Sequence, residues 1–452
     1  MAHPTAEAKV LNFIRESLFT HLPSWLDRLI EGDLGGVESS VEGMMTKLSN
    51  LLLGHLLPAA ARHLVARQQE EGRSNVAQRP HTVRLRSGCQ VCVPSLYDKR
   101  PDAHSDQARH LVARHWSLIG GASPRRYDAM TYAAVSLPSY DLAQCLLERH
   151  GVGSCISGVR DLTNKLANRV HRAGEVNFLL GPEESLAGKR VVISSDGGRT
   201  LTRQHNGRVS DKNYACFDAQ WREPKLFVID VVDEHGKQCR KHLPIYGCRF
   251  SDDDHLLLLR QYLERLSIQE AAEVQLIADG ATWVWNKVPR MLVELGVDAA
   301  RTTQTLDYYH AVQHLEALFK TLPTRIGKGQ RSRWWKRCKQ WLWQGRSRGI
   351  VRLFGGLYQR FPPEMKTELN YFTKHRQRMY YADYEQGNLL CGSGIVESSV
   401  RRVINLRYKN TSTFWNQDTV EKLYCLRGAA LSKRWDTMMK NLTNQSSSMG
   451  QE

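Results

Sequence analysis

The sequence has no long hydrophobic run, and this absence excludes the simplest kind of membrane protein. A helix that crosses a bilayer needs ~18–20 consecutive apolar residues, whereas the strongest apolar run, LSNLLLGHLLPAAA at 48–61, is shorter and predicts a buried helix. The N-terminal segment MAHPTAEAKVLNFIRESLF contains acidic residues and lacks the apolar centre of a secretory signal. We therefore expect neither a membrane partner nor a secretory leader.

Cysteine is sparse and shows no regular spacing. Ten cysteines are scattered through 452 residues, which is typical of reduced thiols in a cytoplasm rather than of a disulfide scaffold. Cys89 and Cys92 form a Cys-x-x-Cys pair, but the next cysteines, Cys145 and Cys155, do not supply the other two ligands of a zinc site. The sequence predicts a cytoplasmic protein and leaves open whether Cys89 and Cys92 bind zinc.

Negative charge is under-represented. The chain has 63 Lys and Arg against 46 Asp and Glu, which gives a net charge of +17. Such an excess favours a polyanionic partner, of which nucleic acid is the commonest. Ribosome-associated and membrane-surface proteins are also basic, so the charge alone leaves those alternatives open. The length predicts two to four domains.

The N-terminal part of the chain is predicted to be helical apart from one short hairpin. Residues 1–80 repeat apolar residues at spacings of three and four, and 81–94 alternate apolar and polar residues. A helical stretch is then predicted from 105 to 172, with breaks at 120–124 and 137–139.

Residues 141–170, within the expected helical DNA-binding region 81–180, have the pattern of a helix-turn-helix. A helix at Asp141–His150 ends at Gly151, and a second helix follows at about Ser157–Val170. The second helix carries three basic residues, namely Arg160, Lys165 and Arg169. Helix, glycine-containing turn and basic second helix are the parts of a DNA reader of this kind. A plain helical hairpin has the same pattern, so both interpretations stay open.

From about residue 188 strands replace the helical pattern. They are predicted at 189–198, 225–236, 238–247, 273–280 and 299–307, the second and third as a hairpin. Helices are predicted at 252–272 and 281–296. The order β-β-β-α-β-α-β is that of a mixed sheet with helices on its faces, and it is similar to the ribonuclease-H-like core of many nucleases and integrases.

We therefore predict an α+β multidomain protein with an α-rich N-terminal DNA-binding region. The ribonuclease-H-like core is expected at 185–310 and 386–435, and an all-α basic insertion is expected at 311–385. A polar tail at 436–452 is expected to fray over its last dozen residues.

Three acidic residues are candidate metal ligands. Asp196 closes the strand VVISSD before Gly197-Gly198, and Asp279 closes VQLIAD before Gly280. Glycine after such an acid lets a metal and a phosphate approach the backbone closely. The third candidate is Glu397, on a helix whose buried stripe is predicted to be Val396, Val400 and Val403. Each Asp-Gly alone is more typical of a turn, but their placement on the first and fourth strands favours a shared site.

The chemistry of such a site would be phosphoryl transfer. Carboxylate oxygens suit Mg²⁺ or Mn²⁺, and two ions ~4 Å apart activate an attacking oxygen and stabilise a leaving one at phosphorus. Water as nucleophile gives DNA hydrolysis, and a 3′-hydroxyl gives strand transfer.

Four motifs in order resemble the DDE transposases of bacterial insertion sequences, and most closely the ISKra type and its mutator-like relatives. They are SDGG, IADGATWVWN, LDYYHAVQHL and GSGIVESSVRRV, and the resemblance covers roughly 185–430. It implies that Asp196, Asp279 and Glu397 form the metal-binding triad and that an all-α insertion separates the last two. Asp307 and His310 resemble the family's Cys/Asp-x-x-His pair, which implies an accessory role. The family also implies a bacterial, nucleoid-associated protein.

The expected insertion is basic and rich in tryptophan. Between Thr321 and Arg352 there are ten Lys or Arg and no acid. Five of the basic residues are candidates for a phosphate track, namely Arg331, Arg333, Lys336, Arg337 and Lys339. Four tryptophans are interleaved with them, and the spacing of Trp334, Cys338, Trp341 and Leu342 favours a buried helical stripe over base stacking. A second basic row beside Glu397 consists of Arg401, Arg402, Arg407 and Lys409.

The sequence thus predicts a transposase that acts on transposon ends and target DNA as a homo-oligomer. Two alternatives stay open. A ribonuclease-H-like nuclease or resolvase would share the triad but would not join strands. A transposase-derived DNA-binding protein would have lost catalysis.

Overall fold

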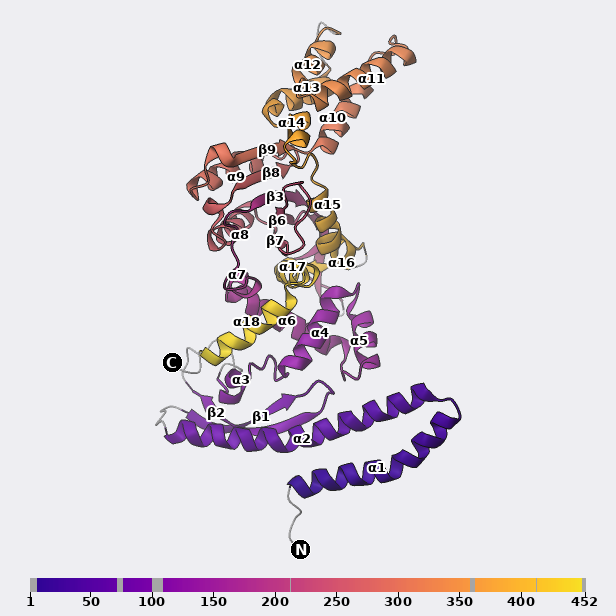
Figure 1. Cartoon of the computed structure of the whole chain (residues 1–452), viewed down its shortest axis with the longest axis vertical. Coiled ribbons are helices and arrows are strands. Elements are labelled where there is room, and N and C mark those ends of the chain that lie inside the picture. Colours follow the sequence, from indigo (N-terminus) through magenta and orange to yellow (C-terminus); the bar gives the residue numbers. More distant parts are fainter. Residues whose placement is uncertain are drawn as a thin grey trace. The chain divides into compact units, whose positions relative to one another are not determined.

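The computed structural model describes residues 6–70, 76–99, 109–211, 213–357, 362–411 and 413–448. Contacts divide the chain into two units (Figure 1), which are described separately. The first unit comprises Met1–Ala173 with Met439–Glu452, and the second comprises Gly174–Met438. No helix in the described ranges is long and apolar enough to cross a membrane.

The first unit begins with two long helices and a β-hairpin. These elements are α1 (Ala6–Ile30), α2 (Leu34–Glu70), β1 (Val76–Arg84) and β2 (Gln90–Asp98). The strands pair antiparallel with Val83 opposite Val91, and the C-terminal part of α2 packs its buried Ala61 against this hairpin. The hairpin is longer than predicted, because pairing extends back to Val76, which the sequence pattern had placed in the helical region.

A group of shorter helices follows, as the helical stretch predicted. They are α3 (Leu111–His115), α4 (Pro124–Ser136), α5 (Tyr140–Arg149) and α6 (Ile156–Arg172). The last three pack against one another, with Leu166 of α6 fully buried. Ser139 caps α5 by accepting a 3.1 Å hydrogen bond from Leu142 N. Residues 105–108 of the predicted stretch lie outside the described residues.

The second unit is built on a five-stranded mixed sheet. Its strands are β3 (Arg190–Gly197), β6 (Lys225–Val232), β7 (Ile245–Arg249), β8 (Glu273–Ala278) and β9 (Thr302–Leu306). They lie in the order β7-β6-β3-β8-β9. β6 runs antiparallel to both of its neighbours, whereas β3, β8 and β9 run parallel to one another. The predicted β-β-β-α-β-α-β order is thus confirmed for these strands.

Helices lie on both faces of this sheet. Those that connect the strands are α8 (Asp252–Arg265), η1 (Ile268–Glu270), α9 (Thr282–Glu294) and η2 (Ala299–Arg301), and α7 (Glu175–Leu179) precedes β3. Figure 1 shows α8 and α9 on one side of the sheet and α15 (Gly394–Val400) on the other. Both faces are therefore covered, which explains why the strands β3, β6 and β8 are almost continuously buried.

A second hairpin was not predicted from the sequence. β4 (Thr200–Val209) and β5 (Ala215–Arg222) form a ribbon that continues from β3, and the short β10 (Trp415–Asn416) pairs with β4. Asn206-Gly207 looks like a hairpin turn, but it lies at an irregularity within the ribbon, where Gly207 has a φ of 76°. Most of β5 is exposed, so the apolar alternation by which half-buried strands are recognised is missing.

The predicted strand at 238–247 was misplaced. The chain turns after β6 as expected, but β7 begins only at Ile245. Pro244 precedes it, and because proline has no N–H to donate to a ladder, the strand starts after that residue.

The described residues of the insertion form helices joined by short turns, as predicted. It contains α10 (Tyr308–Lys320), α11 (Lys328–Trp343), α12 (Ser347–Gly355), α13 (Pro363–Lys374), η3 (Arg376–Arg378) and α14 (Tyr381–Gln386). The chain then returns to the sheet through α15, η4 (Arg401–Asn405), α16 (Leu406–Tyr408) and α17 (Gln417–Leu431).

The predicted fraying of the C-terminal tail is wrong for its described part. α18 spans Trp435–Ser448. Trp435, Met438 and Leu442 recur at helical spacing and are buried, so this apparently polar segment has an apolar face that holds it. Residues 449–452 lie outside the described residues.

Candidate active site

Two of the predicted acids follow neighbouring parallel strands. Ser195 of β3 pairs with Ala278 of β8, so Asp196 and Asp279 occupy the same level at one edge of the sheet. Asp279 Oδ1 accepts a 2.9 Å bond from Ala281 N, and its backbone carbonyl accepts a 2.7 Å bond from Trp285 Nε1. Trp285 therefore holds the end of this strand.

The register also brings a third aspartate to this edge. Ala278 of β8 pairs with Leu306 of β9, so Asp307 follows β9 at the level where Asp279 follows β8. From the sequence, only the resemblance to the family motif indicates a role for Asp307, and that role is accessory. Its place at the end of the last parallel strand is an independent signal that could have been used.

Charge repulsion and burial shape the chemistry of Asp196. The pKa of Asp196 is raised to about 6, mainly by burial and in addition by the negative charges of Asp279 and Glu397. The 2.7 Å bond from Gly197 N and the charge of His310 oppose this rise. The three predicted triad residues therefore lie close enough to act on one another electrostatically.

Glu397 lies on α15, which packs against β3 and β6. The predicted stripe Val396, Val400 and Val403 is buried, with each residue at most 4% exposed. Glu397 itself is exposed. The π-helix η4 follows directly, and such single wide turns are frequent near functional sites.

Asp307 is fully buried, and both of its carboxylate oxygens have partners. Oδ1 accepts a 2.7 Å bond from His310 N, which caps α10, and lies 3.2 Å from His310 Nδ1. Oδ2 accepts a short bond from Ser393 N, directly before α15. Ser393 Oγ in turn donates to Glu397 Oε1 over 3.3 Å. Asp307 thus connects the start of α10 to the helix that carries Glu397.

These bonds determine the protonation states of Asp307 and His310. Burial alone would raise the pKa of Asp307, but the hydrogen bonds from His310 and Ser393 outweigh it and lower the pKa to about 2. The hydrogen bond to Asp307 raises the pKa of His310 to about 8, with further support from the charges of Asp279 and Asp196. The pair is therefore an aspartate next to a largely protonated histidine at neutral pH.

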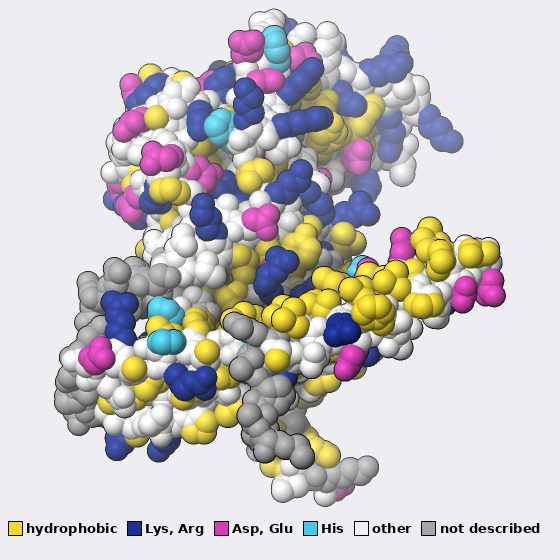
Figure 2. All heavy atoms as spheres, turned by 60° about the horizontal axis from the view of Figure 1, so that its bottom comes forward, with side chains coloured by type: hydrophobic (Ala, Val, Ile, Leu, Met, Phe, Trp, Pro, Cys, Tyr) yellow, Lys and Arg dark blue, Asp and Glu magenta, His cyan; other side chains and the backbone are white. Residues whose placement is uncertain are grey.

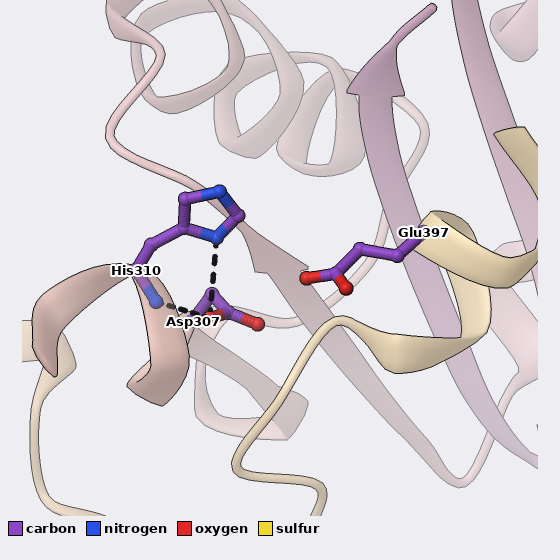
Figure 3. A group of neighbouring side chains, drawn as sticks. All are labelled: Asp307, His310 and Glu397. Atoms are coloured by element: carbon purple, nitrogen blue, oxygen red, sulfur yellow. Dashed lines mark hydrogen bonds and ion pairs between the residues drawn. The ribbon is translucent and has the colours of Figure 1, made fainter. Parts of the chain in front are cut away.

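Within the described ranges, the side chains close enough together to share one metal ion are Asp307, His310 and Glu397, whose ligand atoms lie within 4.8 Å of one another. Figure 3 shows the Glu397 carboxylate pointing toward the other two. The ligand atoms of the predicted triad, Asp196, Asp279 and Glu397, do not all lie within this distance of one another. The Glu397 carboxylate accepts its bond from Ser393 Oγ, on the side of Asp307 and His310.

The glycines after the two acids have a packing role that the sequence analysis did not predict. A Cβ on Gly198 would lie 2.7 Å from Ile404 Cδ1, and one on Gly280 would lie 2.5 Å from Tyr371 Cε2. These glycines therefore let neighbouring side chains approach the backbone at the edge of the sheet that carries Asp196 and Asp279, called the acidic edge below.

The basic residues predicted in the insertion divide into two kinds. Arg333, Lys336 and Arg337 are exposed and share one face of α11 at spacings of three and four. Arg331 instead donates to the backbone carbonyls of Leu322, Pro323 and Ile326, so its guanidinium belongs to the fold of the insertion. Lys339 is half-buried.

The tryptophans of α11 largely pack against neighbouring rings. Trp335 contacts Phe319, and Trp343 contacts Tyr308 and Tyr381. Arg337 lies 4.6 Å above the ring of Trp341.

The basic row after Glu397 is likewise mixed. Arg401 and Lys409 are exposed, whereas Arg402 donates to Tyr246 Oη over 3.2 Å. Arg407 is buried beside the rings of Tyr408 and Trp415.

In the first unit, α6 has one exposed face. Arg160 and Lys165 are exposed on it, and Arg169 lies one turn after Lys165 on the same side of the helix. Arg160 pairs with Asp161 over 3.2 Å, and Arg169 is half-buried.

Comparison of the sequence with protein-family models and with curated proteins finds no match. Among solved structures, the chain is similar to the Drosophila P element transposase strand transfer complex, with 11% sequence identity and a TM-score of 0.26. The similarity covers 72% of this chain and 83% of that chain.

Proposed function

We propose that this protein is a DDE-type DNA transposase that cuts DNA at insertion-sequence ends and joins the 3′-hydroxyl to target DNA. The observation that carries the proposal is the acidic edge of the sheet. Asp196 and Asp279 follow adjacent parallel strands at one level, and α15 brings Glu397 within electrostatic reach of Asp196. Sequence motifs of the ISKra and mutator-like type cover the same residues.

The sheet supports a ribonuclease-H-like core. The strand order β7-β6-β3-β8-β9, with only β6 reversed, is the arrangement of that fold. The triad then comes from the first strand, the fourth strand and a late helix, as the resemblance implies. The helical insertion separates Asp279 from Glu397.

The acidic edge fits divalent cations. Asp196, Asp279 and Glu397 offer only hard oxygen ligands, which suit Mg²⁺ or Mn²⁺. The raised pKa of Asp196 reflects burial and uncompensated negative charge, and bound cations would compensate that charge. Two ions held there would supply activation of the attacking oxygen and stabilisation of the leaving oxygen.

The residues around the triad have supporting roles. Asp307 holds Ser393 at the start of α15 and so fixes the position of the helix that carries Glu397. His310 places a positive charge beside three carboxylates, which suits a site that receives the phosphate backbone. Asp307 is a positioning residue in this scheme, because both of its oxygens are already engaged.

The DNA path follows from exposed positive charge. Arg333, Lys336 and Arg337 on α11 provide a phosphate-contacting row, and Arg401 and Lys409 provide further charge after Glu397. We propose α5 and α6 as the reader of the end sequence, with Arg160 and Lys165 on the exposed face of α6. Because transposition pairs two ends, we propose that two or more copies assemble on DNA.

Incubation with Mg²⁺ and DNA that carries the element's own ends tests the proposal. The wild-type protein is expected to cleave at the ends and to form joined product. Asp196→Asn is expected to lower cleavage at least 100-fold, because even partners of metal ligands contribute ~10–100-fold, while binding to the DNA persists. The matched control is Asp233→Asn, a carboxylate in the turn at the opposite end of the sheet, which is expected to cleave normally.

Each outcome separates one of the alternatives. Cleavage without any joined product would identify a nuclease or resolvase instead. Sequence-specific binding without cleavage would identify a transposase-derived DNA-binding protein. An Asp196→Asn protein with full activity would refute the site.

A further inference from the structure

Helix α1 buries almost none of its own surface. Among its residues whose burial is described, Trp25 is the buried one, and its Nε1 donates to Ser40 Oγ of α2 over 2.8 Å. With Val37 of α2 also buried, this contact holds the two helices together near their connection. An isolated helix is marginal in water because helices draw their stability from a packed face. The 25 residues of α1 therefore need a surface that the described residues of the first unit do not supply.

Both helices expose long apolar stripes. On α1 the stripe consists of Leu11, Leu18, Leu22, Leu26 and Leu29, which are 38–65% exposed. On α2 it consists of Leu34, Met45, Leu52 and Leu56, which are 38–61% exposed. Steps of 3, 4, 7 and 11 residues keep side chains on one side of a helix. Figure 2 shows hydrophobic side chains gathered along these helices.

The two stripes match in length. The first covers 18 residue steps and the second covers 22, which correspond to ~27 Å and ~33 Å at ~1.5 Å per residue. Phe19 and Ile30 widen the first stripe and are 74% and 77% exposed. A pair of such helices from another molecule would cover the stripes along their full length.

The area is that of a stable interface. The exposed fractions of these eleven side chains add up to about six whole side chains, or on the order of 900 Å² at ~150 Å² each. The largest apolar patch of a typical monomer is ~300–600 Å². Two such patches in contact would bury on the order of 1,800 Å², within the ~1,200–2,000 Å² of specific interfaces.

The net charge of residues 6–70 indicates what kind of partner covers the stripes. Residues 6–70 contain six Lys and Arg and eight Asp and Glu, a net charge of −2 in a chain of +17. This segment is therefore the wrong part of the protein for a polyanion. Two nearly neutral copies face each other without strong repulsion, and neither has a single-sign surface that calls for an oppositely charged partner.

We propose that α1 and α2 form a homodimer interface, in which two helices from each of two copies of this chain pack their apolar stripes together. The association requires no DNA and does not rest on the proposed enzymatic function. A twofold axis makes such a contact self-complementary and closed.

The test is the mass of the full-length protein in solution without DNA, measured by light scattering and sedimentation. The wild type is expected at twice the chain mass of 51.6 kDa. Leu18→Glu/Leu22→Glu on α1 and Leu52→Glu/Leu56→Glu on α2 are each expected to weaken association at least 100-fold and give monomers, because each charge must be desolvated or the stripe left uncovered. The matched control is Leu257→Glu/Val293→Glu, two substitutions at side chains 55% and 60% exposed on other helices, which is expected to remain dimeric.

A second measurement keeps the proposal testable if a glutamate variant fails to fold. Phe19→p-benzoyl-phenylalanine leaves the stripe apolar, and irradiation is expected to give a covalent species of twice the chain mass. The same photoreactive residue at Val293 is expected to give none. A monomeric wild type, a dimer that survives both glutamate pairs, or crosslinking from Val293 but not from Phe19 would each overturn the proposal.

Discussion

In the proposed site, Asp307 orients its neighbours rather than binding a metal. Its oxygens accept bonds from His310 N and Ser393 N, and Ser393 Oγ donates to Glu397. In Asp307→Asn one carboxylate oxygen is replaced by an NH₂ group, which cannot accept a hydrogen bond, so the bond from either His310 N or Ser393 N is lost. We expect the rate constant for cleavage to fall ~10–100-fold, the usual effect of losing a residue that orients a ligand. The affinity for end DNA should stay unchanged, and single-turnover cleavage with a separate binding titration measures both.

A matched variant separates this role from helix capping in general. Asp298 also caps a short helix with its carboxylate, by accepting from Ala300 N over 2.9 Å, but it lies before β9 rather than after it. Asp298→Asn should therefore cleave normally. Equal losses in both variants, or a loss of DNA affinity in Asp307→Asn, would contradict the positioning role.

His255 is a second buried residue with a measurable consequence. It is fully buried, with Nδ1 3.1 Å from the carbonyl oxygen of Lys225 and Nε2 3.0 Å from Ser195 Oγ, beside Asp196 in the chain. Burial lowers the pKa of His255 to about 3. Because the unfolded chain binds the proton at about pH 6.5, the stability due to neutral His255 is complete above that pH and is lost as the pH falls toward 3.

This residue should make the second unit sensitive to acid. Between pH 6.5 and pH 5 the free energy of unfolding should fall by about 2 kcal/mol through His255 alone. In His255→Gln this contribution disappears, so the variant should be less stable at pH 7 but should lose less stability on acidification. Urea unfolding of both proteins at pH 7 and pH 5 measures the difference, and parallel losses would contradict the assignment.

At the residue scale the sequence predicted the acids better than their arrangement. Asp196 and Asp279 could be found because each ends an apolar strand before glycine. That Asp307 lies level with them depends on the pairing of β8 with β9, which no local pattern specifies. The Glu397 side chain lies beside Asp307 and His310, which come from another part of the chain, and no local pattern specifies this either.

Among the helices, α11 carries an exposed basic row. Arg333, Lys336 and Arg337 face solvent, whereas Cys338 and Leu342 on the other side are fully buried. If this row contacts phosphates, each lost contact should reduce the slope of log affinity against log salt by ~0.9. We expect Lys336→Ala/Arg337→Ala to reduce the slope by about 1.8 on end DNA, as measured by titration at several salt concentrations.

The control for this prediction is a second pair of exposed basic residues. Arg240→Ala/Lys241→Ala removes the same charge from the loop before β7, at the end of the sheet away from the acids. Its slope should match that of the wild type. A slope that falls equally in both pairs would indicate a general effect of net charge rather than a path along α11.

Elements with an apolar face were predictable, and exposed ones were not. β3, β6 and β8 are buried on both sides and contain several β-branched residues. The apolar residues of α10 and α11 recur at helical spacing. β5 has no buried face, so its pattern carried no signal. The continuation of α18 to Ser448 was not predicted, because its last residues are mostly Asn, Thr, Gln and Ser.

Across the whole molecule, positive charge and apolar surface are separated. Residues 6–70 carry −2 of a total of +17, so the remaining residues carry +19. The exposed apolar stripes lie within the nearly neutral segment, whereas the acidic edge and the basic row of α11 lie in Gly174–Met438. The proposed association between copies and the proposed contact with DNA thus use different parts of the sequence, and we expect that one can be removed without the other.

This separation predicts how a monomeric variant behaves on DNA. Leu18→Glu/Leu22→Glu leaves every proposed DNA contact intact, so its affinity for a single end and its salt slope should equal those of the wild type. Pairing of two ends requires two copies held together, so energy transfer between two differently labelled ends should fall at least tenfold, and joined product should fall with it. Leu257→Glu/Val293→Glu should pair ends normally. Loss of single-end affinity in the stripe variant would show that α1 and α2 contribute to DNA binding, and normal end pairing would show that another surface brings the ends together.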